Sequence, residues 1–98
     1  MTDFSKYSAI IIGAGDATGS ALCKKFALNG YKVCAARRPG NLDKFKQLEN
    51  DIKAADGWIK CFGVDAREEE SIQDLFKQVE EEIAPIDVVI FNPGANVF

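Results

Sequence analysis

The sequence predicts an α/β fold, a doubly wound parallel sheet truncated after the fourth strand, with the order β-α-β-α-β-α-β. Short unbroken apolar runs alternate with longer stretches whose apolar residues recur at helical spacing, a pattern typical of strands joined by helices. A glycine-rich turn also follows the first apolar run. Right-handed crossovers would place helices on both faces of the sheet, and we expect one incomplete domain over residues 1–98.

The first unit is a predicted buried strand followed by a helix. Residues 8–15, SAIIIGAG, form an apolar run that ends in glycine, as expected of a strand covered on both faces. In residues 18–29, four apolar side chains fall near one helical face: Ala21, Leu22, Phe26 and Ala27. Gly30 suits the left-handed position that ends a helix.

The second unit repeats this pattern. Residues 31–36, YKVCAA, read as a second buried strand, and Asn41 is a candidate N-cap for the next helix. The apolar positions of that helix are Leu42, Phe45, Leu48, Ile52 and Ala55. Gly57 marks its end, because glycine commonly follows the last turn of a helix.

The remaining elements are a strand, a helix and a strand. Residues 58–64, WIKCFGV, and 86–91, IDVVIF, are the two further apolar runs. Between them, three glutamates at 68–70 suit a helix N-terminus, and Pro85 stops the helix. Its apolar stripe consists of Ile72, Leu75, Phe76, Val79 and Ile83. In the strand order 3-2-1-4, the fourth strand would be an edge with exposed apolar side chains.

Composition excludes several classes of function. The net charge is −3, which argues against nucleic acid and anionic membranes as partners. No apolar run approaches the roughly 18 residues of a membrane span, and we expect a cytoplasmic protein. The sequence has no histidine, so histidine-based nucleophilic catalysis and a conventional zinc site are not expected. Three widely spaced cysteines predict buried, reduced thiols: Cys23, Cys34 and Cys61.

The glycine-rich turn is the main candidate for a binding site. Gly13, Gly15 and Gly19 fall where the first strand passes into the first helix, where backbone amides and the helix dipole favour an anion such as a pyrophosphate. The alternative is a turn that only packs the helix on the strand. A P-loop is excluded, because Ser20 rather than lysine follows Gly19.

The end of the second strand indicates which dinucleotide would bind. NAD and S-adenosylmethionine sites usually carry an acid there for the ribose hydroxyls, whereas this strand ends in Arg37 and Arg38. Guanidinium groups suit a 2′-phosphate by charge and by bidentate geometry. These residues favour NADP(H), and the alternative is a solvated pair of arginines before Pro39.

Residues 8–98 resemble the N-terminal part of a classical short-chain dehydrogenase/reductase, which implies a Rossmann-like fold. That family opens with T-G-x-x-x-G-x-G, and IGAGDATG keeps the outer glycines but has Ile12 for the threonine and Ala17 for the middle glycine. The alanine would weaken cofactor binding if its position required a positive φ. The resemblance assigns cofactor binding to six residues of the turn: Gly13, Gly15, Asp16, Ala17, Thr18 and Gly19.

Two later segments also resemble the family. Asp65 in GVDAR follows the third strand, where the family places an aspartate near the adenine, and the backbone of Ala66 would line the same pocket. Asp65 is equally a candidate N-cap for the third helix. Asn92 and Gly94 in IFNPGA match the family's N-N-A-G segment beside the cofactor. The resemblance implies a structural rather than a chemical role for Asn92.

The resemblance implies an NADP(H)-dependent oxidoreductase that transfers hydride between the cofactor and a carbonyl or alcohol substrate. The family's chemistry uses a serine and a Tyr-x-x-x-Lys pair after the fourth strand. Here Tyr7 and Tyr31 are followed four residues later by Ile11 and Ala35. We therefore expect this chain to be an inactive cofactor-binding fragment of a longer enzyme.

Two alternatives remain at the level of the sequence. One is a non-catalytic nucleotide-binding or interaction module that pairs, or associates with itself, through its open fourth strand. The other is a fragment of an S-adenosylmethionine-dependent methyltransferase, because the IFNPGA segment has a passing similarity to the N-P-P-Y motif. The absence of an acid after the second strand disfavours the methyltransferase.

Overall fold

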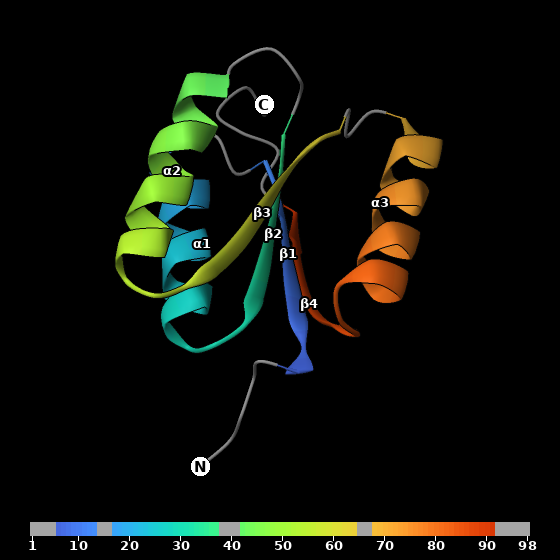
Figure 1. Ribbon diagram of the computed structural model, residues 1–98. Coiled ribbons are helices and arrows are strands. Elements are labelled where there is room, and N and C mark those ends of the chain that lie inside the picture. The colour runs from blue at the N-terminus through green and yellow to red at the C-terminus, as the bar shows by residue number, and fades with distance from the viewer. Residues whose placement is uncertain (1–5, 14–16, 38–41, 65–67, 92–98) are drawn as a thin grey trace.

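The fold is a four-stranded parallel sheet with helices on both faces, seen in a computed structural model that describes residues 6–13, 17–37, 42–64 and 68–91 (Figure 1). The strands are β1 (Ser8–Ile12), β2 (Lys32–Arg37), β3 (Trp58–Gly63) and β4 (Ile86–Phe91). The helices are α1 (Ala17–Leu28), α2 (Leu42–Ala54) and α3 (Glu69–Glu82). The predicted fold class and element order are therefore confirmed.

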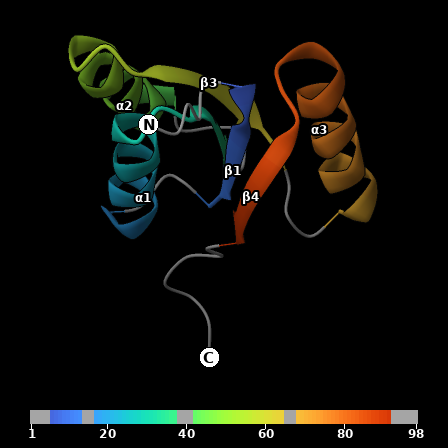
Figure 2. The ribbon, with the colours of Figure 1, turned by 90° about the horizontal axis from the view of Figure 1, so that it is seen from below.

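The strand order β3-β2-β1-β4 is the one predicted from the sequence. Helices α1 and α2 cover one face and α3 covers the other, as the view along the strands shows (Figure 2). Because side chains alternate across a strand, Ala9 and Ile11 pack toward α1 and α2, whereas Ile10 and Ile12 pack toward α3. All five residues of β1 are buried, which explains why its sequence is apolar without interruption.

The ends of α1 and α2 use left-handed residues in different ways. Gly30 has a φ of 97° and follows α1, as predicted, and the Tyr31 N–H closes the turn on the Phe26 carbonyl at 3.2 Å. After α2, the residue with positive φ is Asp56, at 61°. Gly57 is needed for space, because a Cβ atom there would lie 2.7 Å from Cγ2 of Ile52.

Hydrogen bonds fasten β4 to the start of the sheet. The buried Ser8 hydroxyl lies 3.2 Å from the carbonyl oxygens of Ala84 and Pro85, and its N–H donates to Pro85 at 2.8 Å. The Tyr31 hydroxyl donates to Asp87 at 2.6 Å. These bonds join segments far apart in the sequence at the amino ends of the strands.

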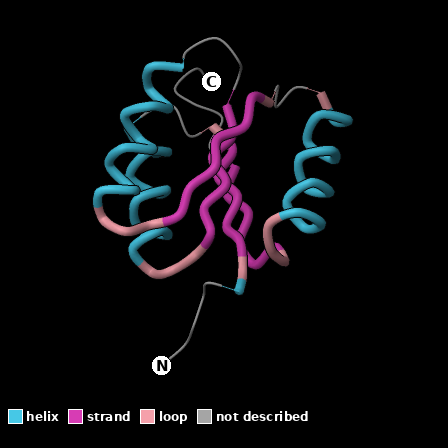
Figure 3. The backbone as a smooth tube through the Cα atoms, viewed as in Figure 1, coloured by secondary structure: helices cyan, strands magenta, loops and turns pink. Residues whose placement is uncertain are grey.

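Helices and strands alternate along the described chain, and each strand is joined to the next one in the sequence by a helical crossover (Figure 3). No helix within the described ranges has the length and apolar character that crossing a membrane requires.

Candidate dinucleotide site

Among the predicted binding residues that the structure describes, Gly13 and Arg37 lie at the end of the sheet where the four parallel strands reach their carboxyl ends. Ile12 of β1 lies opposite Ala36 of β2 and Phe91 of β4, and Arg37 lies opposite Gly63 of β3. This end is at the top of the sheet in Figure 1. Ligands of open α/β sheets bind outside the carboxyl ends of the strands, which is where the described residues Gly13 and Arg37 lie.

Gly13 forms the turn that leaves β1. Its φ of 88° lies in the left-handed region, which favours glycine. Its N–H donates to the carbonyl oxygen of Ala36 at 2.7 Å, which ties the turn to the neighbouring strand. Gly13 therefore supplies the bend, and amide donors for an anion would have to come from the residues that follow it. The sequence pattern did not indicate this bond.

The first helix begins at Ala17, only four positions after Gly13. Asp56 is the one non-glycine residue of the described ranges with a positive φ, so the alanine at position 17 meets no backbone conflict. Thr18 lies in the first turn of α1, and Gly19 is buried in the same helix. The first amides of α1 carry the positive end of its dipole. Gly15 and Asp16 lie outside the described residues.

Arg37 is the last residue of β2 and is half-buried. Its carbonyl oxygen accepts a hydrogen bond of 2.7 Å from the Val64 N–H, which fixes the ends of β2 and β3 together. The side-chain nitrogens Nε and Nη1 of Arg37 are buried. The sequence of β2, KVCAAR, contains no carboxylate. A cation therefore stands at this strand end, where NAD sites carry an acid.

The other predicted residues lie outside the described part of the chain: Arg38, Asp65, Ala66, Asn92 and Gly94. Two residues that precede them in the sequence are described. Val64 is buried in the core cluster on the α3 side, and Phe91 ends β4 with 55% of its surface exposed. The N-cap position of α3 is taken by Glu68, so the N-cap role predicted for Asp65 is wrong, because the helix begins at Glu69. The cofactor-binding roles assigned to these five residues stay predictions.

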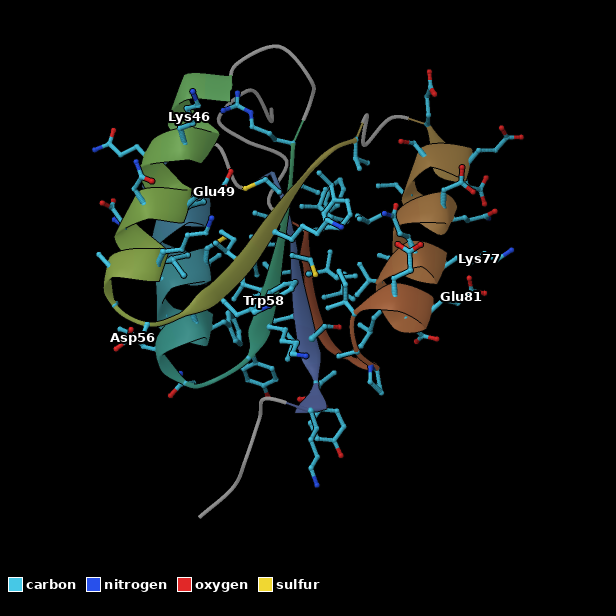
Figure 4. All side chains as sticks on the ribbon, in the orientation of Figure 1. Lys46, Glu49, Asp56, Trp58, Lys77 and Glu81 are labelled. Atoms are coloured by element: carbon cyan, nitrogen blue, oxygen red, sulfur yellow. The ribbon has the colours of Figure 1, made fainter. Side chains whose placement is uncertain are left out.

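The cysteines offer no reactive thiol near this end of the sheet. All three are free, with Cys23 and Cys34 buried and Cys61 half-buried. Burial raises the pKa of each thiol from 9.0 to about 12, and at Cys61 the charge of Glu49 (labelled in Figure 4) and a hydrogen bond to it add to the effect. A thiol with a raised pKa is a poor nucleophile at neutral pH.

Comparison with known proteins identifies a family. A family model described as short chain dehydrogenase matches residues 7–98. A short chain dehydrogenase of Pseudocercospora fijiensis is 37% identical over 84 residues, which are 85% of this chain and 26% of the relative. The residues matched by the family model include the turn after β1 and the ends of β2, β3 and β4.

Solved structures share the same fold. A short-chain dehydrogenase from Rhodopseudomonas palustris superposes with a TM-score of 0.85 at 40% identity, covering 94% of this chain and 42% of that one. A metagenomic short-chain oxidoreductase in complex with NADP gives a TM-score of 0.85 at 24% identity, covering 96% of this chain and 42% of its own. The chain thus spans less than half the length of the proteins that it matches.

Proposed function

Because the chain belongs to the short-chain dehydrogenase family, we propose that it is the NADP(H)-binding part of an oxidoreductase acting on a carbonyl or alcohol substrate. The observation that carries the choice of NADP(H) is Arg37 at the end of β2, a strand without a carboxylate. A guanidinium group attracts a 2′-phosphate, whereas a carboxylate would repel it. The metagenomic oxidoreductase in complex with NADP shows that this fold can hold such a cofactor.

The described geometry fits a dinucleotide. Gly13 turns the chain away from the sheet, and the amino end of α1 begins four positions later, so helix amides would hold the pyrophosphate. Arg37 would hold the 2′-phosphate with Arg38, and Asp65 would contact the adenine. Asn92 and Gly94 would lie beside the nicotinamide ribose.

The cofactor would supply or accept the hydride, while this chain binds and orients it. The sequence contains no Tyr-x-x-x-Lys pair. The groups that bind the substrate and move its proton would therefore belong to other parts of a longer enzyme. We propose residues 1–98 as a single cofactor-binding unit within that enzyme.

Replacing both arginines tests the proposed cofactor. We expect Arg37→Asp combined with Arg38→Ala to weaken NADPH binding by at least about 10- to 100-fold, because even one hydrogen bond to a charged group contributes about 1.5–3 kcal/mol. The affinity for NADH should rise or stay the same, because NADH has no 2′-phosphate for the arginines to bind. Titration of the purified protein with each nucleotide, followed by nucleotide fluorescence, measures both constants.

Lys77→Asp is the matched control, because Lys77 is exposed on α3 and its replacement repeats the charge reversal away from the end of β2 (Figure 4). It should leave the ratio of the NADPH and NADH constants unchanged. An unchanged ratio in the arginine variant would contradict the choice of NADP(H). If that variant binds neither NADPH nor NADH, the arginines contribute to the binding of both dinucleotides and do not select the 2′-phosphate.

A second candidate is an interaction module that associates through β4. This strand is at one end of the sheet order, and Val89 and Phe91 expose 44% and 55% of their surfaces. Exposed apolar side chains on an open strand favour pairing with another chain. The candidate predicts a mass that rises with concentration in light scattering, and Val89→Lys should suppress the rise. A constant monomer mass would overturn it.

A further inference from the structure

Strand β3 lies at the side of the sheet opposite to β4, and it carries an aromatic and basic surface. Register places Lys32 beside Trp58, and Ala36 beside Phe62. Ala36 and Phe62 belong to the core on the α3 side, and alternation along the strands puts the other side chains on that same face. We call this surface the β3 edge patch, and it consists of Lys32, Trp58, Lys60 and Phe62.

Each lysine of the patch lies near an aromatic ring. The Lys32 ammonium is 5.9 Å from the centroid of the Trp58 ring, and the Lys60 ammonium is 5.5 Å from that of Phe62. Trp58 keeps 39% of its surface exposed (Figure 4). The patch therefore offers an apolar ring surface with positive charge at two points, and tryptophan is among the residues that contribute most to protein interfaces.

The backbone beside the patch is also open. Strand β3 ends the order β3-β2-β1-β4, so one of its backbone edges has no neighbouring strand among the described residues. In doubly wound sheets further strands follow the fourth strand, in the order 3-2-1-4-5-6, which leaves β3 outermost. Such an edge presents N–H and C=O groups that an extended segment can pair with.

Charge selects the kind of segment. The charged side chains of the β3 edge patch are both lysines, and neither β2 nor β3 contains an acidic residue. A second copy of the chain is disfavoured in the register that sets Trp58 opposite Phe62, because that register also sets Lys60 opposite Lys60. Like charges directly opposite destabilise a strand pair. An acidic segment would instead complement the patch.

We propose that the β3 edge patch binds an extended acidic segment of a partner protein, which adds to the sheet as a strand along β3. Its backbone would pair with the open edge of β3. Its acidic side chains would all point to the face of the patch, with carboxylates near Lys60 and Lys32 and with their methylene groups against the Trp58 ring. The surface is separate from the dinucleotide site, so the two proposals stand independently.

A pair of peptides tests the proposal with the purified protein. The probes are capped six-residue peptides of alternating valine and glutamate, or of valine and lysine, each carrying a fluorescent label for anisotropy. We expect the glutamate peptide to bind on the order of tenfold more tightly, because each cross-strand charge pair contributes up to about 1 kcal/mol. Equal binding of the two peptides, or binding of neither, overturns the proposal.

Lys60→Glu should remove or reverse this preference, and Lys60→Gln should weaken it, because Lys32 keeps its charge. Lys77→Glu, the same change on the exposed surface of α3, should leave it unaltered. Unchanged midpoints of urea unfolding in all three variants show that each remains folded. If Lys60→Glu does not fold, the Lys60→Gln protein is used for the test. A preference that neither substitution of Lys60 weakens overturns the assignment to the patch.

Two further arms test the mode and the class of partner. A glutamate peptide N-methylated at alternate residues keeps its charges but loses backbone donors, so equal binding would overturn strand addition. An oligothymidine probe tests stacking of bases on Trp58. Tighter binding of the oligonucleotide than of the glutamate peptide would make the patch a nucleic-acid surface and overturn a protein partner.

Discussion

One tyrosine near the amino ends of the strands links β2 to β4 through its side chain. Tyr31 lies at the start of β2, and its hydroxyl reaches Asp87 of β4 across β1. The Phe26 ring meets Tyr31 edge-on, with ring centroids 5.5 Å apart. The phenol is therefore held between an aromatic contact and a carboxylate acceptor.

The Tyr31–Asp87 bond makes stability depend on alkaline pH. The hydrogen bond to Asp87, then burial, then the Asp87 charge raise the pKa of Tyr31. Since the folded-state pKa exceeds the unfolded value of about 10, the stabilisation is present below that pH and is lost as pH rises through the folded pKa. We expect Tyr31→Phe to lower the free energy of unfolding at pH 8 and to flatten its decline above pH 10.

Urea unfolding between pH 8 and 11.5 measures this effect. Tyr7→Phe is the matched control, because Tyr7 is exposed and its replacement should leave the pH profile unchanged. The buried thiols also lose stabilisation between about pH 9 and 12, but they do so equally in all three proteins. Parallel profiles for Tyr31→Phe and the wild-type protein would contradict the expected role of the bond.

The turn between α2 and β3 requires glycine at position 57. Residue 57 stands where a Cβ atom would lie 2.7 Å from Cγ2 of Ile52 and 3.1 Å from Cβ of Ala27. Both neighbours are buried. The glycine therefore allows α1, α2 and the start of β3 to approach one another closely.

Gly57→Ala should destabilise the protein by about 1–3 kcal/mol, because an inserted methyl group in a packed site forces its neighbours apart. Chemical denaturation measures the change. Asp56→Gly is the control at the neighbouring position, where φ is 61°; relief of the left-handed conformation should keep its stability within about 1 kcal/mol of wild type or raise it. A fully stable Gly57→Ala protein would show that the contact relaxes without cost.

For the whole molecule, the sequence predicted the architecture better than the site. Continuous apolar runs are diagnostic of strands buried on both faces, and β1, buried throughout, shows why that signal was strong. Gly30 was predicted at the left-handed end of α1, and its φ of 97° confirms it. Both features depend on local sequence, which a single chain reveals directly.

The details of the site depend on contacts between segments, which the sequence pattern did not reveal. The bond from Gly13 to Ala36 joins two strands, and no feature of either segment indicates it. Asp56 has the positive φ after α2, while Gly57 is required because a Cβ atom there would clash with Ile52 of α2 and lie close to Ala27 of α1. Close packing between distant elements therefore decided what local propensity left open.

The seam between β1 and β4 has a consequence for how the protein folds. Ser8 pairs with Lys32 on one side and with Ile86 on the other. The pairing of β1 with β4 therefore joins residues from nearly the two ends of the described chain. Closing so long a loop is entropically unfavourable, and sheets dominated by such pairings fold slowly. During synthesis, the part of the sheet made of β1, β2 and β3 would form first, and the backbone edge of β1 that pairs with β4 would stay open until β4 is made.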